Sequence, residues 1–131
     1  MSDLYFYGVG RRKSSSARAK YYQGADTLVV HVNKKSINSY FQDFYLQAIL
    51  TALSQYGITT GKLDFFVNGG GIMGQAEACR LAVTKSLVKM EETTYKPIAR
   101  LHGYMSTDLR QVLPKKAGFR KARKREQWSK R

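Results

Sequence analysis

The pattern of apolar and polar positions predicts four strands before residue 70. They cover residues 4–9, 17–22, 27–32 and 62–67. Each segment is short, alternates or is rich in aromatic or β-branched residues, and is bounded by glycine or small polar residues. Because only residues 23–26 separate the second strand from the third, we expect these two strands to pair as a hairpin. In the fourth strand, Leu63, Phe65 and Val67 occupy one face.

Apolar residues at helical spacing predict three helices. The first follows Asp43, which we take as its N-cap, and ends at Gly57. The second covers about residues 75–92, and the third is short, with Pro97 near its start and Gly103 after its end. The stripes expected to face the core are Phe44, Ala48, Ile49, Leu50 or Thr51, Ala52 and Leu53 in the first helix, and Ala76, Cys79, Val83, Leu87 and Met90 in the second.

The size of the chain fits one folded domain followed by an arm. With 131 residues, of which 43% are hydrophobic, it can bury one modest core. All the predicted strands and helices end before residue 109, where the composition changes. We therefore expect a globular domain at residues 1–108 and an extended tail at residues 109–131.

The tail carries most of the net charge. Residues 110–131 contain ten basic residues and one acidic residue, so they supply nine of the formal fourteen positive charges. Their apolar residues follow no strand or helix period, and Pro114 and Gly118 interrupt any helix. Like charges extend such a chain, and we expect a polyanion, above all RNA, to order it. A solvated tail without a partner and a membrane-surface peptide are the alternatives, although the tail lacks the apolar stripe of a membrane helix.

Two further segments have the composition of phosphate-binding sites. Arg11, Arg12 and Lys13 precede three serines and Arg18, and we expect this cluster to form a loop whose charges, hydroxyls and amides reach RNA phosphates. An ordinary exposed loop is the alternative. Residues 68–75, Asn-Gly-Gly-Gly-Ile-Met-Gly-Gln, lead from a strand into a helix. Glycines there permit positive φ, and the free amides of the helix start attract an anion.

No residue pattern indicates catalysis or a bound metal. The single cysteine, Cys79, excludes an internal disulfide and a cysteine-based zinc site, and it suits a reducing cytosol. His31 has no ligand partner at metal-binding spacing, so we interpret it as a packing or surface residue. His102 follows a predicted helix, where a basic residue is electrostatically favoured. The first residues resemble neither a secretory leader nor a transit peptide, and no apolar stretch is long enough to span a bilayer.

Three separated segments resemble the family of bacterial-type small-subunit ribosomal protein S-nine. They are residues 8–18 (Gly-Val-Gly-Arg-Arg-Lys-Ser-Ser-Ser-Ala-Arg), residues 69–87 (beginning Gly-Gly-Gly-Ile-Met-Gly-Gln-Ala-Glu-Ala), and residues 115–131 (beginning Lys-Lys-Ala-Gly-Phe-Arg-Lys-Ala-Arg and ending Ser-Lys-Arg). Their order and spacing extend along the whole chain. The resemblance implies an α+β fold, a two-layer α/β sandwich shared with the second domain of ribosomal protein S-five. That fold includes a left-handed βαβ unit, against the usual right-handed rule.

The resemblance also implies partners and site residues. The protein would lie in the head of the small ribosomal subunit in the cytoplasm, bound to the 3′ major domain of 16S-type rRNA and beside neighbouring head proteins. Its tail would reach the peptidyl-site tRNA. No cofactor, small-molecule substrate or membrane is expected. The residues expected to bind rRNA are Arg11, Arg12, Lys13, Ser14, Arg18, Gly69, Gly70, Gly71, Gln75, Arg80, Arg110, Lys115, Lys116, Arg120, Lys121, Arg123, Lys124 and Arg125. Those expected to contact the backbone of the tRNA anticodon stem-loop are Ser129, Lys130 and Arg131.

The chain departs from the family pattern at four places. Asn68 runs directly into Gly69, where members usually have two more residues, so the strand or the loop is shorter here. Glu126 replaces a common proline, which is expected to make the tail less stiff and less basic. Trp128 replaces a smaller aromatic residue and keeps an option for stacking. Thr107 replaces a usual arginine, which removes one candidate phosphate contact.

Two other classes of protein share parts of this pattern. A glycine-rich turn before a helix holds nucleotide phosphates in enzymes, including small-molecule kinases of a related fold, but the spacing here is not Gly-x4-Gly-Lys-Ser/Thr. Asp64 and Glu77 are isolated in sequence, so no carboxylate pair predicts a magnesium site. A free-standing RNA chaperone or nucleoid-type binder would have the same charge but no preference for small-subunit RNA. We therefore expect a structural rRNA-binding protein that is not an enzyme.

Overall fold

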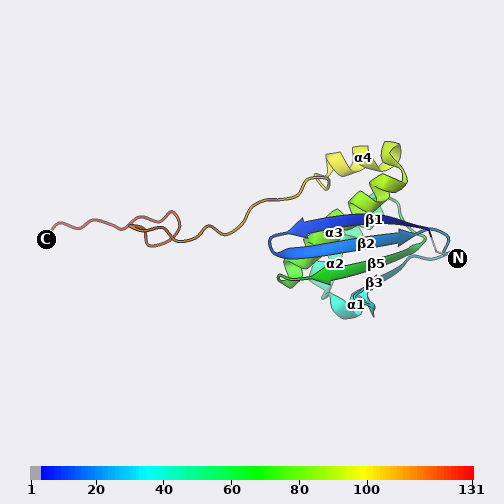
Figure 1. Cartoon of the computed structure of the whole chain (residues 1–131), viewed down its shortest axis with the longest axis horizontal. Coiled ribbons are helices and arrows are strands. Elements are labelled where there is room, and N and C mark those ends of the chain that lie inside the picture. The colour runs from blue at the N-terminus through cyan, green and yellow to red at the C-terminus, as the bar shows by residue number, and fades with distance from the viewer. Residues whose placement is uncertain (1–3) are drawn as a thin grey trace.

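The computed structural model describes residues 4–131 and has two layers, a five-stranded sheet and a set of helices packed on one of its faces (Figure 1). The strands are β1 (Tyr5–Arg12), β2 (Ser15–Tyr22), β3 (Val29–Val32), β4 (Lys35–Ser36) and β5 (Lys62–Asn68). The helices are α1 (Ile37–Tyr40), α2 (Asp43–Gln55), α3 (Ile72–Met90) and α4 (Glu92–Leu101). The predicted α+β class with two layers is confirmed.

Strand β5 is central in the sheet, whose order is β1-β2-β5-β3-β4. It pairs antiparallel with β2 and parallel with β3, so the predicted hairpin between the second and third strands is wrong. The reason is that residues 23–28 do not turn back on themselves but cross the end of β5. There the Gly61 amide donates to the carbonyl of Ala25 (3.1 Å), and the Gly61 carbonyl accepts from the amide of Val29 (3.0 Å).

The adjacent parallel strands β3 and β5 are joined through β4, α1 and α2. Parallel neighbours require such a crossover, because a tight turn cannot connect them. Part of the loop expected at residues 33–36 is a tight turn, with positive φ at Asn33 (49°) and Lys34 (67°), and the rest is the short strand β4. This connection is the βαβ unit that the resemblance implies, and its left hand stays a prediction.

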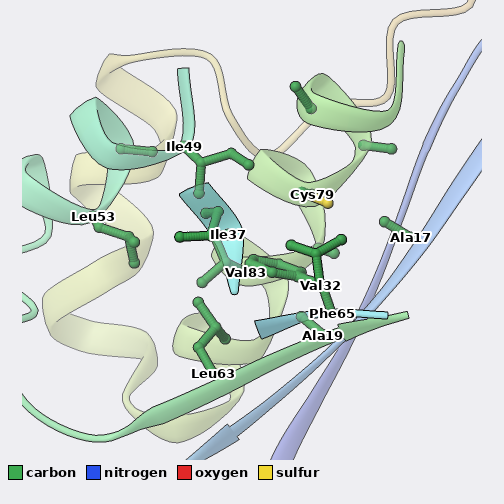
Figure 2. Close-up of a cluster of buried hydrophobic side chains, with 14 of the residues drawn as sticks. Ala17, Ala19, Val32, Ile37, Ile49, Leu53, Leu63, Phe65, Cys79 and Val83 are labelled. Atoms are coloured by element: carbon green, nitrogen blue, oxygen red, sulfur yellow. The ribbon is translucent and has the colours of Figure 1, made fainter. Parts of the chain in front are cut away.

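The core lies between the sheet and helices α2 and α3 (Figure 2). Val32, Leu63 and Phe65 of the sheet and Ile49 and Val83 of the helices are at most 1% exposed. The inner face predicted for β5 is confirmed. The stripe predicted for α3 is confirmed too, with Ala76, Cys79, Val83 and Leu87 buried and Met90 packed against the core.

Two glycines of β1 let α3 lie directly on the strand. A Cβ atom placed on Gly8 would be 2.1 Å from the carbonyl oxygen of Ala82, and one placed on Gly10 would be 2.1 Å from that of Ala78. Both distances are far inside van der Waals contact with backbone atoms, which cannot move aside. Glycine is therefore required at both positions for packing, although glycine inside a strand costs conformational entropy.

The core face predicted for α2 is partly wrong. Ile49, Ala52 and Leu53 are buried as expected, but Phe44 and Leu50 are exposed (75% and 39%), and Leu46 fills an inner position that was not predicted. Phe44 and Leu46 are two residues apart on the helix, so their side chains point about 200° apart, and only Leu46 shares the buried face with Ile49 and Leu53. Asp43 is the first helical residue, and Gln42 occupies the N-cap position.

The boundaries of the last two helices also differ from the sequence prediction. Helix α3 begins at Ile72 rather than near residue 75, and α4 begins at Glu92, five residues before Pro97. Proline is therefore inside α4, where the ion pair between Lys96 and Glu92 supports the preceding turn. The predicted C-terminal glycines are confirmed, with positive φ at Gly57 (69°) and Gly103 (70°).

Candidate nucleic-acid interface

Three basic or glycine-rich segments that are far apart in sequence meet at one end of the domain. They are the tip of the β1–β2 hairpin, the turn between β5 and α3, and the segment that leads into the tail (Figure 1). In Figure 1 this is the end from which the tail departs. The sequence predicted each segment as an RNA contact but gave no sign that they are neighbours.

The basic cluster at the hairpin is mostly strand, which corrects the expected loop. Arg11 and Arg12 close β1 opposite Ser16 and Ser15, and only Lys13 and Ser14 form the turn, with φ of 53° at Lys13. Neighbouring residues of a strand point to opposite faces. As a result, Arg11 is exposed, whereas Arg12 turns towards the helices.

The glycine turn is packed against this hairpin. Gly69 and Gly70 have positive φ (73° and 66°), and a Cβ on Gly70 would be 2.0 Å from the Ser15 hydroxyl. Gly71 differs, because it caps α3 with φ of −96° and has no atom within 4 Å of its Cβ position. Packing thus explains the first two glycines, and the exposed Gly71 at the helix start is open to an approaching ligand.

The Gln75 side chain fixes the shape of the glycine turn. Its amide nitrogen donates to the carbonyl of Gly69 (3.0 Å), and its amide oxygen accepts from the Tyr40 hydroxyl (2.9 Å). Both ends of the amide therefore have protein partners. An rRNA contact by Gln75 stays a prediction, and the structure gives this side chain a positioning role that the sequence did not indicate.

Arg12 joins α3 to the start of the tail. Its Nε donates to a Glu77 carboxylate oxygen (2.7 Å), one terminal nitrogen donates to the carbonyl of Arg110 (2.9 Å), and the other lies 3.5 Å from Asp108 Oδ2. The Arg12 side chain is only 14% exposed. The partners are 65 and 98 residues away in sequence, so no local pattern reveals them. The predicted rRNA contact of Arg12 stays a prediction.

Asp108 and Arg110 form a second link at the same place. The Arg110 guanidinium donates to both oxygens of the Asp108 carboxylate (2.7 to 3.1 Å), and the Arg110 amide donates to one of them (2.9 Å). The Arg110 side-chain hydrogen bonds, then its amide and the charge of Arg12, hold the pKa of Asp108 well below its usual range. We call Arg12, Glu77, Asp108 and Arg110 the tail anchor.

A polar cavity of about 150 Å³ lies beside the tail anchor. Arg80, another predicted rRNA contact, lines it and lies over the ring of Tyr104 with its Cζ 4.7 Å from the ring centroid. The tail anchor and Arg80 therefore place several guanidinium groups around one recess. Such groups are suited to fork onto phosphate oxygens.

The tail extends away from the domain (Figure 1). It forms one local loop, in which Phe119 and Arg125 make an isolated β-bridge and the Arg120 amide donates to the carbonyl of Lys124 (2.8 Å). The guanidinium of Arg125 also lies 5.9 Å from the Phe119 ring centroid. The basic residues predicted to bind RNA are exposed, namely Arg110, Lys115, Lys116, Arg120, Lys121, Arg123, Lys124, Arg125, Lys130 and Arg131, and so is Ser129.

The remaining reactive side chains have structural surroundings. Burial raises the pKa of the Cys79 thiol well above its usual range, so this cysteine is a packing residue. His31 lies at the surface with Nδ1 3.4 Å from a carboxylate oxygen of Asp64. Within residues 4–131 no group of three metal-ligating side chains is assembled. No helix in this part of the chain is long and apolar enough to cross a membrane.

These features define an RNA-binding protein, with a two-layer α+β domain, guanidinium and glycine motifs gathered at one end, and an exposed cationic tail. A family model described as ribosomal protein S9/S16 matches residues 10–131. The chain belongs to this family of ribosomal proteins, which confirms the resemblance seen in the sequence. It is therefore a structural, rRNA-binding constituent of the small ribosomal subunit.

Proposed function

We propose that the protein binds the 3′ major domain of the small-subunit rRNA, in the head of the cytoplasmic ribosome, and extends its tail to the tRNA in the peptidyl site. The observation that carries this proposal is the meeting of the hairpin tip, the glycine turn and the tail anchor at the end where the tail departs. A domain with this arrangement contacts RNA at the same place from which it directs the tail.

The domain contributes phosphate contacts at the hairpin and the glycine turn. Arg11, Lys13 and Ser14 are exposed there, and Arg18 is exposed further along β2. The open helix start at Gly71 adds backbone amides and the positive end of the helix dipole. Phosphate contacts fix position and orientation without carrying sequence information. In this proposal Arg12 and Gln75 act indirectly, by holding the contacting segments in place.

The tail contributes most of the electrostatic affinity. As it follows the RNA backbone, its lysines and arginines displace counterions, and arginines can bind phosphates through two hydrogen bonds. If about eight phosphates are neutralised on a duplex, log affinity falls against log salt with a slope near −7. Ser129, Lys130 and Arg131 would then contact the anticodon stem-loop backbone and hold the tRNA without reading its bases.

Deletion of residues 129–131 tests the tRNA contact. Small subunits that carry the shortened protein should assemble normally and retain peptidyl-site tRNA several-fold less well, measured by filter binding with purified subunits. Charge reversal at Arg11 and Lys13 is the matched control, because it should impair assembly instead. Unchanged tRNA retention and unchanged reading-frame fidelity after the deletion would contradict the contact.

A further inference from the structure

The sheet has a second face that no helix covers in residues 4–131 (Figure 1). Along β2, Ala17, Ala19 and Tyr21 are buried beneath the helices, and the alternate residues Arg18, Lys20 and Tyr22 lie on the other side. The same alternation in β1 and β5 places Tyr5, Lys62 and Phe66 on that side. We call these six residues, Tyr5, Arg18, Lys20, Tyr22, Lys62 and Phe66, the open-face cluster.

Aromatic rings and cations alternate within the open-face cluster. The rings of Tyr5 and Tyr22, opposite each other across β1 and β2, have centroids 5.5 Å apart. Lys20 Nζ lies 4.7 Å from the Tyr5 centroid and 5.6 Å from that of Phe66. Arg18 Cζ lies 5.9 Å from the Phe66 centroid. Lys62 Nζ lies 5.4 Å from the Tyr22 centroid, so three rings on three adjacent strands are spread over the face with a cation beside each of them.

The charge on this face is mostly positive. Arg11, Arg18, Lys20 and Lys62 supply positive charge on these strands, against the single carboxylate of Asp64. Asp64 already pairs with Lys62, whose Nζ lies 3.1 Å from one of its oxygens, and His31 Nδ1 lies 3.4 Å from the other. The ligand that complements this face is therefore anionic, and its flat groups can lie on aromatic rings.

We propose that the open face binds an unpaired stretch of ribosomal RNA, whose bases stack on Tyr5, Tyr22 and Phe66 while Arg18 and Lys20 hold the phosphates. The inference rests on the proposed rRNA-binding function and adds a second, base-stacking surface to it. Unpaired RNA combines an anionic backbone with planar bases, and sheets that bind single strands use this pairing of rings and cations. Arg11, at the hairpin tip, joins the open face to the interface already described.

Two other occupants fit the observations less well. A base-paired helix presents stacked bases whose faces are not accessible, so the aromatic rings would remain unused. An acidic protein segment could pair with the cations, but its carboxylates would leave the three aromatic rings on adjacent strands without a stacking partner. Stacking on each base tolerates any sequence, so the open face should prefer single strands without strong base preference.

The test uses the full chain and a single-stranded RNA of about 12 nucleotides that carries 4-thiouridine, within the range of known single-strand site sizes. The double variant Tyr5→Leu/Phe66→Leu keeps apolar bulk and every charge but removes two rings. Its affinity should fall by about tenfold, with an unchanged slope against salt. Phe44→Leu is the matched control, because Phe44 is 75% exposed on α2, outside the sheet, and its loss should leave affinity unchanged.

Cross-linking and competition give independent readouts. Ultraviolet cross-links from 4-thiouridine should map to residues 5–22 and 62–68 as well as to the tail, and Arg18→Gln/Lys20→Gln should make the salt slope shallower. Equal affinity of the double variant and the wild type, with thermal melting showing both folded, would overturn the inference. The inference would also be overturned if the double variant lost as much affinity for oligoglutamate as for RNA, because an acidic protein segment would then be the better ligand. If the wild-type protein showed no preference for small-subunit rRNA over unrelated RNA in competition, the proposed function itself would be refuted.

Discussion

The globular domain uses some of its basic residues for contacts within the protein, whereas the basic residues of the tail are all exposed. In the domain, Arg12 is 14% exposed and binds two carboxylates and a carbonyl, while Arg80 lies on a tyrosine ring. In the tail, the basic residues from Lys115 to Arg125 are exposed. Net charge therefore overstates how many cations a folded ribosomal protein offers to RNA, because part of that charge holds the protein together. The predictions that follow separate the two uses.

Removal of residues 114–131 should have the largest effect on binding. The truncation keeps Arg110 and the tail anchor but removes nine of the eighteen exposed lysines and arginines. Affinity for rRNA at low salt should fall on the order of a thousandfold, and the salt slope should become much shallower. The urea midpoint of the domain should not change. A loss of domain stability would show that the tail packs on the domain, contrary to the structure.

Gly10→Val should cause the largest loss of stability. The new side chain would begin 2.1 Å from the carbonyl oxygen of Ala78, so β1 and α3 must separate. We expect the free energy of unfolding to fall by about 3 kcal/mol, measured by urea denaturation. Gly71→Ala is the control, because its Cβ meets no atom within 4 Å and φ is −96°. A small effect of Gly10→Val would mean that the contact between α3 and β1 is looser than described.

Two neighbouring arginines should separate structural from RNA-binding charge. Arg12→Ala leaves Glu77 and Asp108 without a shared cation, and unfolding free energy should fall by about 1–3 kcal/mol. Arg11→Ala should change stability by less than about 0.5 kcal/mol and weaken rRNA binding. Urea denaturation gives the unfolding free energy of each variant, and filter binding on the same samples gives its affinity for rRNA. If the two variants lost stability and rRNA affinity to the same extent, Arg11 and Arg12 would not have the separate roles assigned to them.

The smallest expected effect is on the stability of the protein at acidic pH, through Asp108. Because the folded-state pKa of Asp108 is held below its ordinary value of 3.8, its stabilising contribution is fully present above that value and is lost as the pH falls below it. Thermal melting between neutral pH and pH about 3 should show a slightly shallower acid decline for Asp108→Asn than for wild type. Asp26→Asn, far from the tail anchor, is the control. If the stability of Asp108→Asn declined more steeply than that of the wild type, ionised Asp108 would not stabilise the folded protein as stated.

The elements with strong local patterns were predictable, and their partners were not. Strand β5 and helix α3 carry unmistakable periods, and Leu63, Phe65, Val83 and Leu87 are buried as predicted. The pairing of β2 with β5 joins residues forty or more positions apart, such as Lys20 and Asp64. Sequence proximity favoured a local hairpin instead, because nothing in residues 23–28 shows that another strand inserts between β2 and β3.

The site was predictable as a set of residue types but not as an arrangement. Exposed tail cations follow from composition, since a segment without a period cannot bury a face. The partner choice of Arg12 follows from strand register, which places it on the helix side while Arg11 faces outward. The alternation of rings and cations on the open face likewise needs the order of β1, β2 and β5. Each depends on tertiary contacts that are not visible in one segment.

The tail anchor also sets how far the protein can act. It fixes the chain at Arg110, so the 21 residues from 111 to 131 start from a defined point on the domain. Fully stretched, they span at most about 70 Å. A domain of about 100 residues has a radius of gyration near 13 Å. The domain can thus bind one part of a large particle while the end of the tail contacts another part about five such radii away. The point where the tail leaves the domain is fixed by contacts within the protein, before any partner binds.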